Sequence, residues 1–165
     1  MTKNLNQPNI LLTRFEKSLA AVEALEKQVN KVCLKFVASA LTPELSKCLS
    51  PESTDSPKHL QRIKLIKTSI GLKSIKTDKS LVLHPLRLKK TSEEQDLDII
   101  VHTLLLQGEK IAHYQMLHPL AMVMHLQIEA SLLEQTITDN RNTDTWLRQI
   151  VQNIIAQSVL AKTSD

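Results

Sequence analysis

Three of the six histidines lie in one short stretch, GEKIAHYQMLHPLAMVMH at residues 108–125, and histidines gathered on a helix are candidate metal ligands. They are His113, His118 and His125. His118 and His125 share one face of an ideal helix, but seven residues rise about 10 Å, which is too far apart to bind one ion. We therefore interpret these histidines as surface or hydrogen-bonded core groups, and we expect His113 to pair with Tyr114 or with a carboxylate from another helix.

Other chemistries lack the residues that they need. The only glycines are Gly71 and Gly108, so no glycine-rich phosphate loop or glycine-based oxyanion hole is present. Cys33 and Cys48 are isolated from each other in the sequence and are expected to be reduced, structural thiols. We expect no catalytic residue and no cofactor-binding residue, and the sequence favours a non-enzymatic protein over an enzyme.

No segment of the sequence suggests a membrane or an export signal. The N-terminus lacks the apolar core of a signal peptide, and no apolar run approaches the ~18 residues of a membrane span. We expect a cytoplasmic protein that makes one domain over residues 1–165.

The positive charge is concentrated in residues 58–90. The chain carries a net charge of +4, and this segment holds ten basic residues and a single acid, Asp78. One alternative function is therefore a module that binds nucleic acid or another polyanion. The segment contains no aromatic residue for base stacking, so a solvated basic face is the preferred interpretation. The candidate contacts are Lys58, Arg62, Lys64, Lys67, Lys73, Lys76, Lys79, Arg87, Lys89 and Lys90.

Hydrophobic spacing predicts helices throughout the chain. A long amphipathic helix is expected near residues 9–41, with apolar steps of three and four residues from Phe15 to Phe36. Thr42 and Pro43 form a helix-start signal, and SPESTDSPKH (50–59) predicts an interruption before another helix begins at Ser56. The inward apolar residues of that helix are expected to be Leu60, Ile63, Ile66 and Ile70.

Two more long helices complete the expected fold. One begins near TSEEQD (91–96), and the other carries Asp139 and Asn140 near its middle or its start. Residues 71–92 are expected to be an irregular basic connection between helices two and three. The prediction is an all-α, antiparallel four-helix bundle.

Several stretches resemble the YciE/YciF-type ferritin-like family, in the same order along the chain. LEKQVNKVCLKFVASALTPELSKCL (25–49), followed by HLQRIKLI, resembles the start of that family. KIAHYQ (110–115) resembles its K-V-E-H-Y-E on the third helix, and LLEQTITDNRNTD (132–144) resembles its fourth helix. The resemblance implies a ferritin-like bundle, self-association as a homodimer, and a stress-related setting.

The resemblance also implies an iron or manganese pair bound by carboxylates and histidine, and most of those ligand positions are substituted here. Glu26 is retained, and Asp55 and Asp139 are the other acids near ligand positions. The remaining ligand positions carry Thr54, Pro57, Ala112, Gln115, Thr138 and Asn140. We therefore predict a degenerate metal site, no bound metal, and a contact between Glu26 and His113.

The preferred function is a metal-free structural or interaction module. The first alternative is an unusual di-iron or di-manganese oxidase or storage protein, with residual ligands Glu26, Asp55, His113 and Asp139. The second alternative is the polyanion-binding module on residues 58–90.

Overall fold

A computed structural model describes residues 10–73, residue 88 and residues 94–163, and all of its regular secondary structure in these ranges is α-helical. The all-α prediction is confirmed. The helices are α1 (Ile10–Ser39), α2 (Pro43–Leu49), α3 (Pro51–Thr54), α4 (Ser56–Ser69), α5 (Gln95–Val123) and α6 (Gln127–Thr163).

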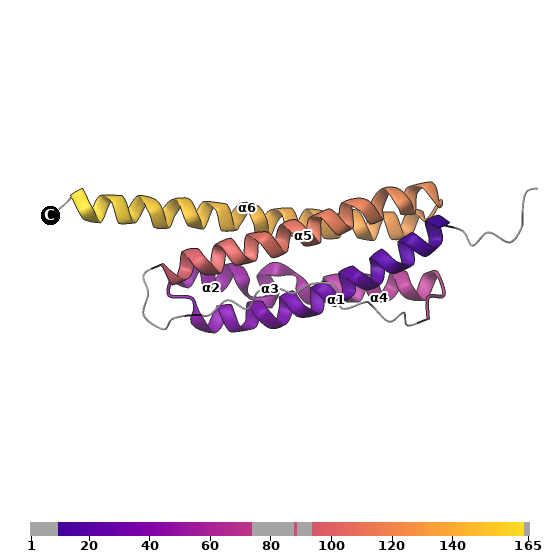
Figure 1. Ribbon diagram of the computed structural model, residues 1–165, viewed down its shortest axis with the longest axis horizontal. Coiled ribbons are helices and arrows are strands. Elements are labelled where there is room, and N and C mark those ends of the chain that lie inside the picture. Colours follow the sequence, from indigo (N-terminus) through magenta and orange to yellow (C-terminus); the bar gives the residue numbers. More distant parts are fainter. Residues whose placement is uncertain (1–9, 74–87, 89–93, 164–165) are drawn as a thin grey trace, which may run out of the picture.

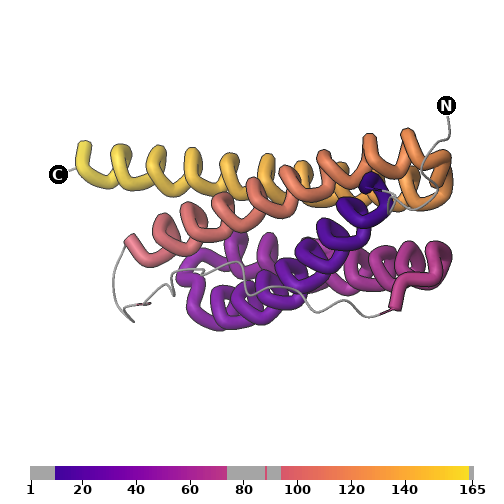
Figure 2. Tube along the Cα trace, turned by 45° about the vertical axis from the view of Figure 1, so that its right-hand side comes forward, coloured from indigo at the N-terminus to yellow at the C-terminus, as the bar shows by residue number. Residues whose placement is uncertain are grey.

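The helices form an elongated bundle in which packed neighbours run in opposite directions (Figure 1). Helix α1 packs against α2, α4 and α5, whereas α6 packs against α2 to α5. The series α2–α4 and helix α5 both start at the same end of the bundle, so α4 ends far from the start of α5 (Figures 1 and 2). Most of the predicted basic connection at 71–92 lies outside the described residues.

The second arm of the bundle, which follows α1, is divided by turn-forming residues into the three helices α2, α3 and α4. Thr42 and Pro43 start α2 as predicted, and Ser50 caps α3 by accepting a hydrogen bond from the Ser53 backbone N–H. Asp55 then adopts a left-handed conformation with φ of 54°, which aspartate tolerates better than most residues. The predicted interruption is confirmed, and the turn at Asp55 sets which face of α4 points inward.

The carboxylate of Asp96 ties the first turn of α5 to the connection between α1 and α2. Its two oxygens accept hydrogen bonds from the backbone N–H groups of Leu41 and Thr42, at 2.8 and 2.7 Å. Asp96 is buried, so these donors have a charged partner in place of water.

Replacing Asp96 by alanine is expected to lower the free energy of unfolding by about 2 kcal/mol, because two backbone donors lose a charged acceptor. Urea denaturation followed by circular dichroism measures the loss. Asp98→Ala is the control, since Asp98 lies in the same turn and is exposed. Equal losses in the two variants would contradict this role for Asp96.

Two apolar clusters form the core, and a layer of polar side chains lies between them. One cluster includes Val29, Phe36 and Leu147, and the other includes Phe15 and Ile63. The buried polar residues at the boundary are Glu26, His59, Gln107, Lys110, Asn140 and Thr143. The inward positions of each long helix keep the same spacing through this layer, but here they are occupied by polar residues.

No helix in the described part of the chain is long and apolar enough to cross a membrane.

Candidate functional site

A buried carboxylate is the centre of the polar layer. Glu26 on α1 has no exposed surface, and three side chains approach it. Tyr114 donates a hydrogen bond from its hydroxyl to Oε1 at 2.8 Å. Lys110 Nζ lies 2.9 Å from Oε2, and His59 Nδ1 lies 3.1 Å from Oε1. One carboxylate thus joins α1 to α4 and α5.

The imidazole of His59 extends this arrangement to α6. Its Nε2 lies 3.4 Å from Oδ2 of Asp139, and Arg62 contacts the same oxygen at 2.6 Å. Arg62 also donates a hydrogen bond to the Thr136 hydroxyl at 3.2 Å. We call the six residues that contact one another here the Glu26 cluster: Glu26, His59, Arg62, Lys110, Tyr114 and Asp139.

Helical spacing brings the cluster residues onto inward faces. Lys110 and Tyr114 are four residues apart on α5, so both point to the same side of that helix. His59 precedes Ile63 by four residues and Ile66 by seven, and these two isoleucines are core residues of α4. The cluster residues therefore occupy positions that an apolar side chain would fill in an ordinary bundle.

The buried charges hold one another in defined protonation states. Burial alone would raise the pKa of Glu26, but the Lys110 ammonium and His59 outweigh it and the pKa is lowered. Burial and the neighbouring Glu26 carboxylate raise the pKa of Tyr114 well above its ordinary value. At neutral pH Glu26 is therefore ionised, and Tyr114 keeps the proton that it donates to Glu26.

The structure brings together two of the four residual metal-ligand candidates. Glu26 and Asp139 both contact His59. Asp55 instead contacts Lys58, at 2.6 Å, and its side chain is partly exposed. His113 is half-buried, and the partners of Glu26 are His59, Lys110 and Tyr114, so the predicted contact between Glu26 and His113 is wrong.

Two central members of the cluster were missed by the sequence analysis. The family resemblance placed the ligand histidine of helix two at Pro57, but Pro57 is exposed and His59 faces Glu26. His59, and not Leu60, continues the inward spacing of Ile63 and Ile66, and that spacing was a usable signal. Lys110 similarly lies on the inward face that runs through Tyr114, but a lysine is expected outside the core.

The donor set does not fit a dimetal centre. Among the described residues, no group of three or more His, Cys, Asp or Glu side chains is arranged to hold a metal ion. The ammonium of Lys110 lies 2.9 Å from the carboxylate that such a centre would need, and it would repel a divalent cation there. His59 lies between Glu26 and Asp139, which keeps the two carboxylates on opposite sides of its ring.

Several basic residues of the segment 58–90 form ion pairs within the protein. Arg62 turns inward to Asp139, Lys58 contacts Asp55, and Lys67 contacts Glu23 at 2.7 Å. Lys64 and Lys73 are exposed. Lys76, Lys79, Arg87, Lys89 and Lys90 lie outside the described residues.

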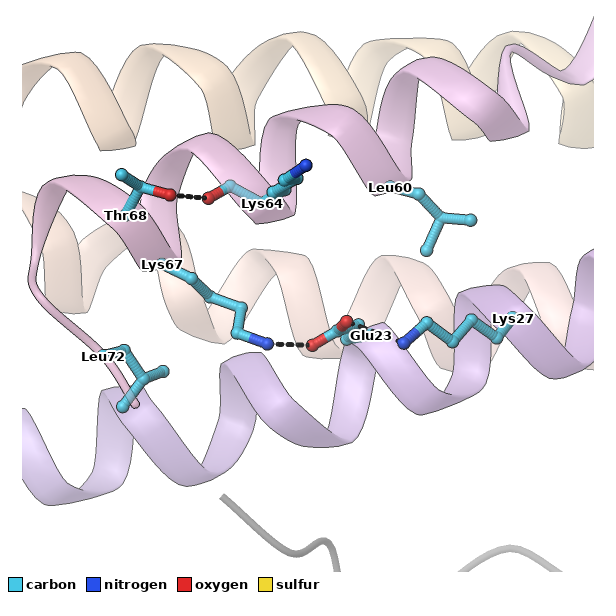
Figure 3. A pocket seen from close by; sticks show the side chains of 7 residues that line it. All are labelled: Glu23, Lys27, Leu60, Lys64, Lys67, Thr68 and Leu72. Atoms are coloured by element: carbon cyan, nitrogen blue, oxygen red, sulfur yellow. Dashed lines mark hydrogen bonds and ion pairs between the residues drawn. The ribbon is translucent and has the colours of Figure 1, made fainter. Parts of the chain in front are cut away.

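A groove of about 370 Å³ lies between α1 and α4 (Figure 3). Three lysines line it, and two of them, Lys27 and Lys67, contact the Glu23 carboxylate at 2.8 and 2.7 Å. The paired carboxylate offsets part of the positive charge of the groove. Leu60 and Leu72 supply its apolar lining.

The two cysteines are buried and unpaired, in agreement with the structural role predicted for them. Burial raises the pKa of the Cys33 thiol to about 11 and that of the Cys48 thiol to about 12. Both are thiols at neutral pH, and neither is an activated nucleophile.

Comparison with known proteins identifies the family to which this chain belongs. Residues 11–160 match the family described as "Domain of unknown function (DUF892)". No curated protein sequence matches the chain.

Two solved structures share the fold. The Escherichia coli stress protein YciF is 20% identical, with a TM-score of 0.79 over 90% of this chain and 99% of that chain. YcfI from Rhodopseudomonas palustris, described as a proposed structural protein, is 17% identical, with a TM-score of 0.73 over 90% of this chain and 98% of that chain. At these identities the likeness shows the fold alone.

Proposed function

This chain is a YciF-type member of the DUF892 family, and from that premise we propose that it is a metal-free, ferritin-like helical bundle acting as a structural or interaction module. The observation that carries the proposal is the position of Lys110. Its buried ammonium lies 2.9 Å from Glu26 and supplies, from within the chain, the positive charge that a metal would bring to this carboxylate.

The arrangement of the helices supports the ferritin-like assignment. Packed neighbours run in opposite directions, and the chain must cross the length of the bundle between α4 and α5. One long crossover between the second and third arms is typical of ferritin-like bundles.

In this proposal the Glu26 cluster fixes how the helices fit together. Its members come from α1, α4, α5 and α6. The ion pairs form in only one rotational orientation of each helix about its own axis. Buried polar groups can favour one packing over alternatives in this way. The cluster then has a conformational role and needs no metal supply from the cell.

Elemental analysis tests this proposal. Protein purified from cells grown with added iron and manganese is expected to contain far less than one metal ion per chain, because Lys110 occupies the place of the cation. Glu26→Gln is the control variant. One or two metal ions per wild-type chain that disappear in Glu26→Gln would overturn the proposal and support a dimetal oxidase or storage protein.

The homodimer and the stress-related setting remain predictions from the resemblance. Light scattering of the purified protein measures the first. The polyanion-binding alternative is less favoured, because Lys58, Arg62 and Lys67 are engaged in ion pairs. A gel shift with duplex DNA at low salt tests it directly.

A further inference from the structure

A small, largely enclosed cavity of about 10 Å³ adjoins the Glu26 cluster between α1, the start of α4 and α5. Ser56, Gln107 and Lys110 line it, and all three are at least nine-tenths buried. The cavity is separate from the carboxylate contacts already described, although Lys110 belongs to both.

Polar atoms of these three residues lack sufficient partners. The Ser56 hydroxyl and the Gln107 carbonyl oxygen are buried without a hydrogen-bond partner in the described structure. The Lys110 ammonium has three N–H donors, and its ion-pair partner is Glu26 alone among the described residues. An unsatisfied buried polar group costs about 1–3 kcal/mol, so two of them around one cavity, beside a buried ammonium, require an explanation.

The size and lining of the cavity limit what it can hold. A volume of about 10–15 Å³ on this measure corresponds to one water molecule, and polar cavities of this kind are normally hydrated. Because Glu26 already balances the charge of Lys110, the cavity has no need of an anion. A neutral molecule that both accepts and donates hydrogen bonds fits the lining best.

We propose that this cavity binds a single water molecule, which accepts a hydrogen bond from Lys110, donates one to the Gln107 carbonyl oxygen and pairs with the Ser56 hydroxyl. Ser56 is the first residue of α4, immediately after the left-handed Asp55. The water therefore links the start of α4 to α5, next to the turn that separates α3 from α4. That link helps to hold α4 in the orientation about its axis that points His59 toward Glu26.

A crystal structure of the full chain at high resolution, from crystals soaked in sodium bromide, tests the proposal. The expected result is one density peak within hydrogen-bond distance of Lys110, Gln107 and Ser56, without bromine anomalous scattering. An empty cavity around well-ordered side chains would overturn the proposal. An anomalous peak would also overturn it, because the ligand would then be a halide.

Two variants extend the test to the proposed contacts. Gln107→Met keeps a similar side-chain length but removes the oxygen, and it is expected to lose the water. Thr103→Val is the control, because Thr103 lines the same cavity but donates its hydroxyl to the Ile99 carbonyl oxygen at 2.8 Å. The water should persist in Thr103→Val, and its persistence in Gln107→Met would contradict the assigned contact.

A solution measurement covers the case in which the wild-type protein does not crystallise. Water-to-protein cross-relaxation in NMR spectra is expected at protons of Ser56 and Gln107 in the wild-type protein, with the sign of a long-lived bound water. Its absence there would overturn the proposal. Either failure would leave the metal-free assignment intact, because elemental analysis tests that separately.

Discussion

Replacing Lys110 by methionine is expected to lower the free energy of unfolding by about 3–5 kcal/mol at pH 7, because the variant leaves a buried carboxylate without its cation. Lys110 and Glu26 are both almost fully buried, and their charged atoms are 2.9 Å apart. Methionine keeps an unbranched side chain, so the change in packing is small. Urea denaturation followed by circular dichroism measures the loss.

The pH dependence of this loss separates a charge effect from a packing effect. Without the ammonium, the pKa of Glu26 is expected to rise above its wild-type value, because burial, the largest single influence on that carboxyl group, is then opposed by His59 and no longer by Lys110. A raised folded-state pKa gives stability that is present at low pH and is lost as pH rises. The difference between wild type and Lys110→Met should therefore shrink as the pH falls from 7 toward 4.

Lys27→Met is the matched control, because Lys27 also lies near a glutamate. Lys27 pairs with Glu23 at 2.8 Å, but its side chain is 63% exposed. An exposed pair of this kind contributes less than about 1 kcal/mol. A similar loss in both variants, or a loss in Lys110→Met that does not depend on pH, would contradict the proposed role of Lys110.

Local signals allowed much of the fold to be predicted. The helix start at Thr42 and Pro43 and the interruption around Pro51 and Pro57 follow from backbone restrictions that act within a few residues. The family resemblance placed Glu26 at a metal-ligand position, and the structure buries its side chain completely.

The partners of Glu26 could not be predicted in the same way. A contact between two helices depends on the rotation of each about its own axis, and the left-handed turn at Asp55 sets that rotation for α4. Several turn conformations suit the sequence around Asp55. Pro57 and His59 are only two residues apart in α4, but they lie at different positions around the helix surface. Lys110 was missed for another reason, because lysine is rarely buried without a partner and the partner lies on another helix.

Replacing Glu26 by glutamine is expected to destabilise the protein by a similar amount, about 3–5 kcal/mol at pH 7, because Lys110 is then a buried cation without a counter-charge. In the wild-type protein the pKa of Glu26 is lowered, so its contribution is present above its ordinary value of 4.5. That contribution is lost as the pH falls through the lowered pKa. Acid unfolding of the wild type should therefore begin below about pH 4.5, and this step should be reduced in Glu26→Gln.

The two single variants should have different pH profiles. In the wild type the raised pKa of Tyr114 gives stability that is lost as the pH rises above about 10. Glu26→Gln lacks the acid step that Glu26 gives the wild type, whereas Lys110→Met gains stability relative to the wild type as the pH falls from 7 toward 4.

A double-mutant cycle completes the test of the pair. Because Glu26 and Lys110 are in contact, the variant that carries both replacements should lose less stability than the sum of the two single losses. Urea denaturation between pH 4 and pH 9, with Trp146 fluorescence as the probe, measures all four proteins under the same conditions. Additive losses with parallel pH profiles would show that the two groups act independently, and the cluster would then lose its role as an internal substitute for a metal.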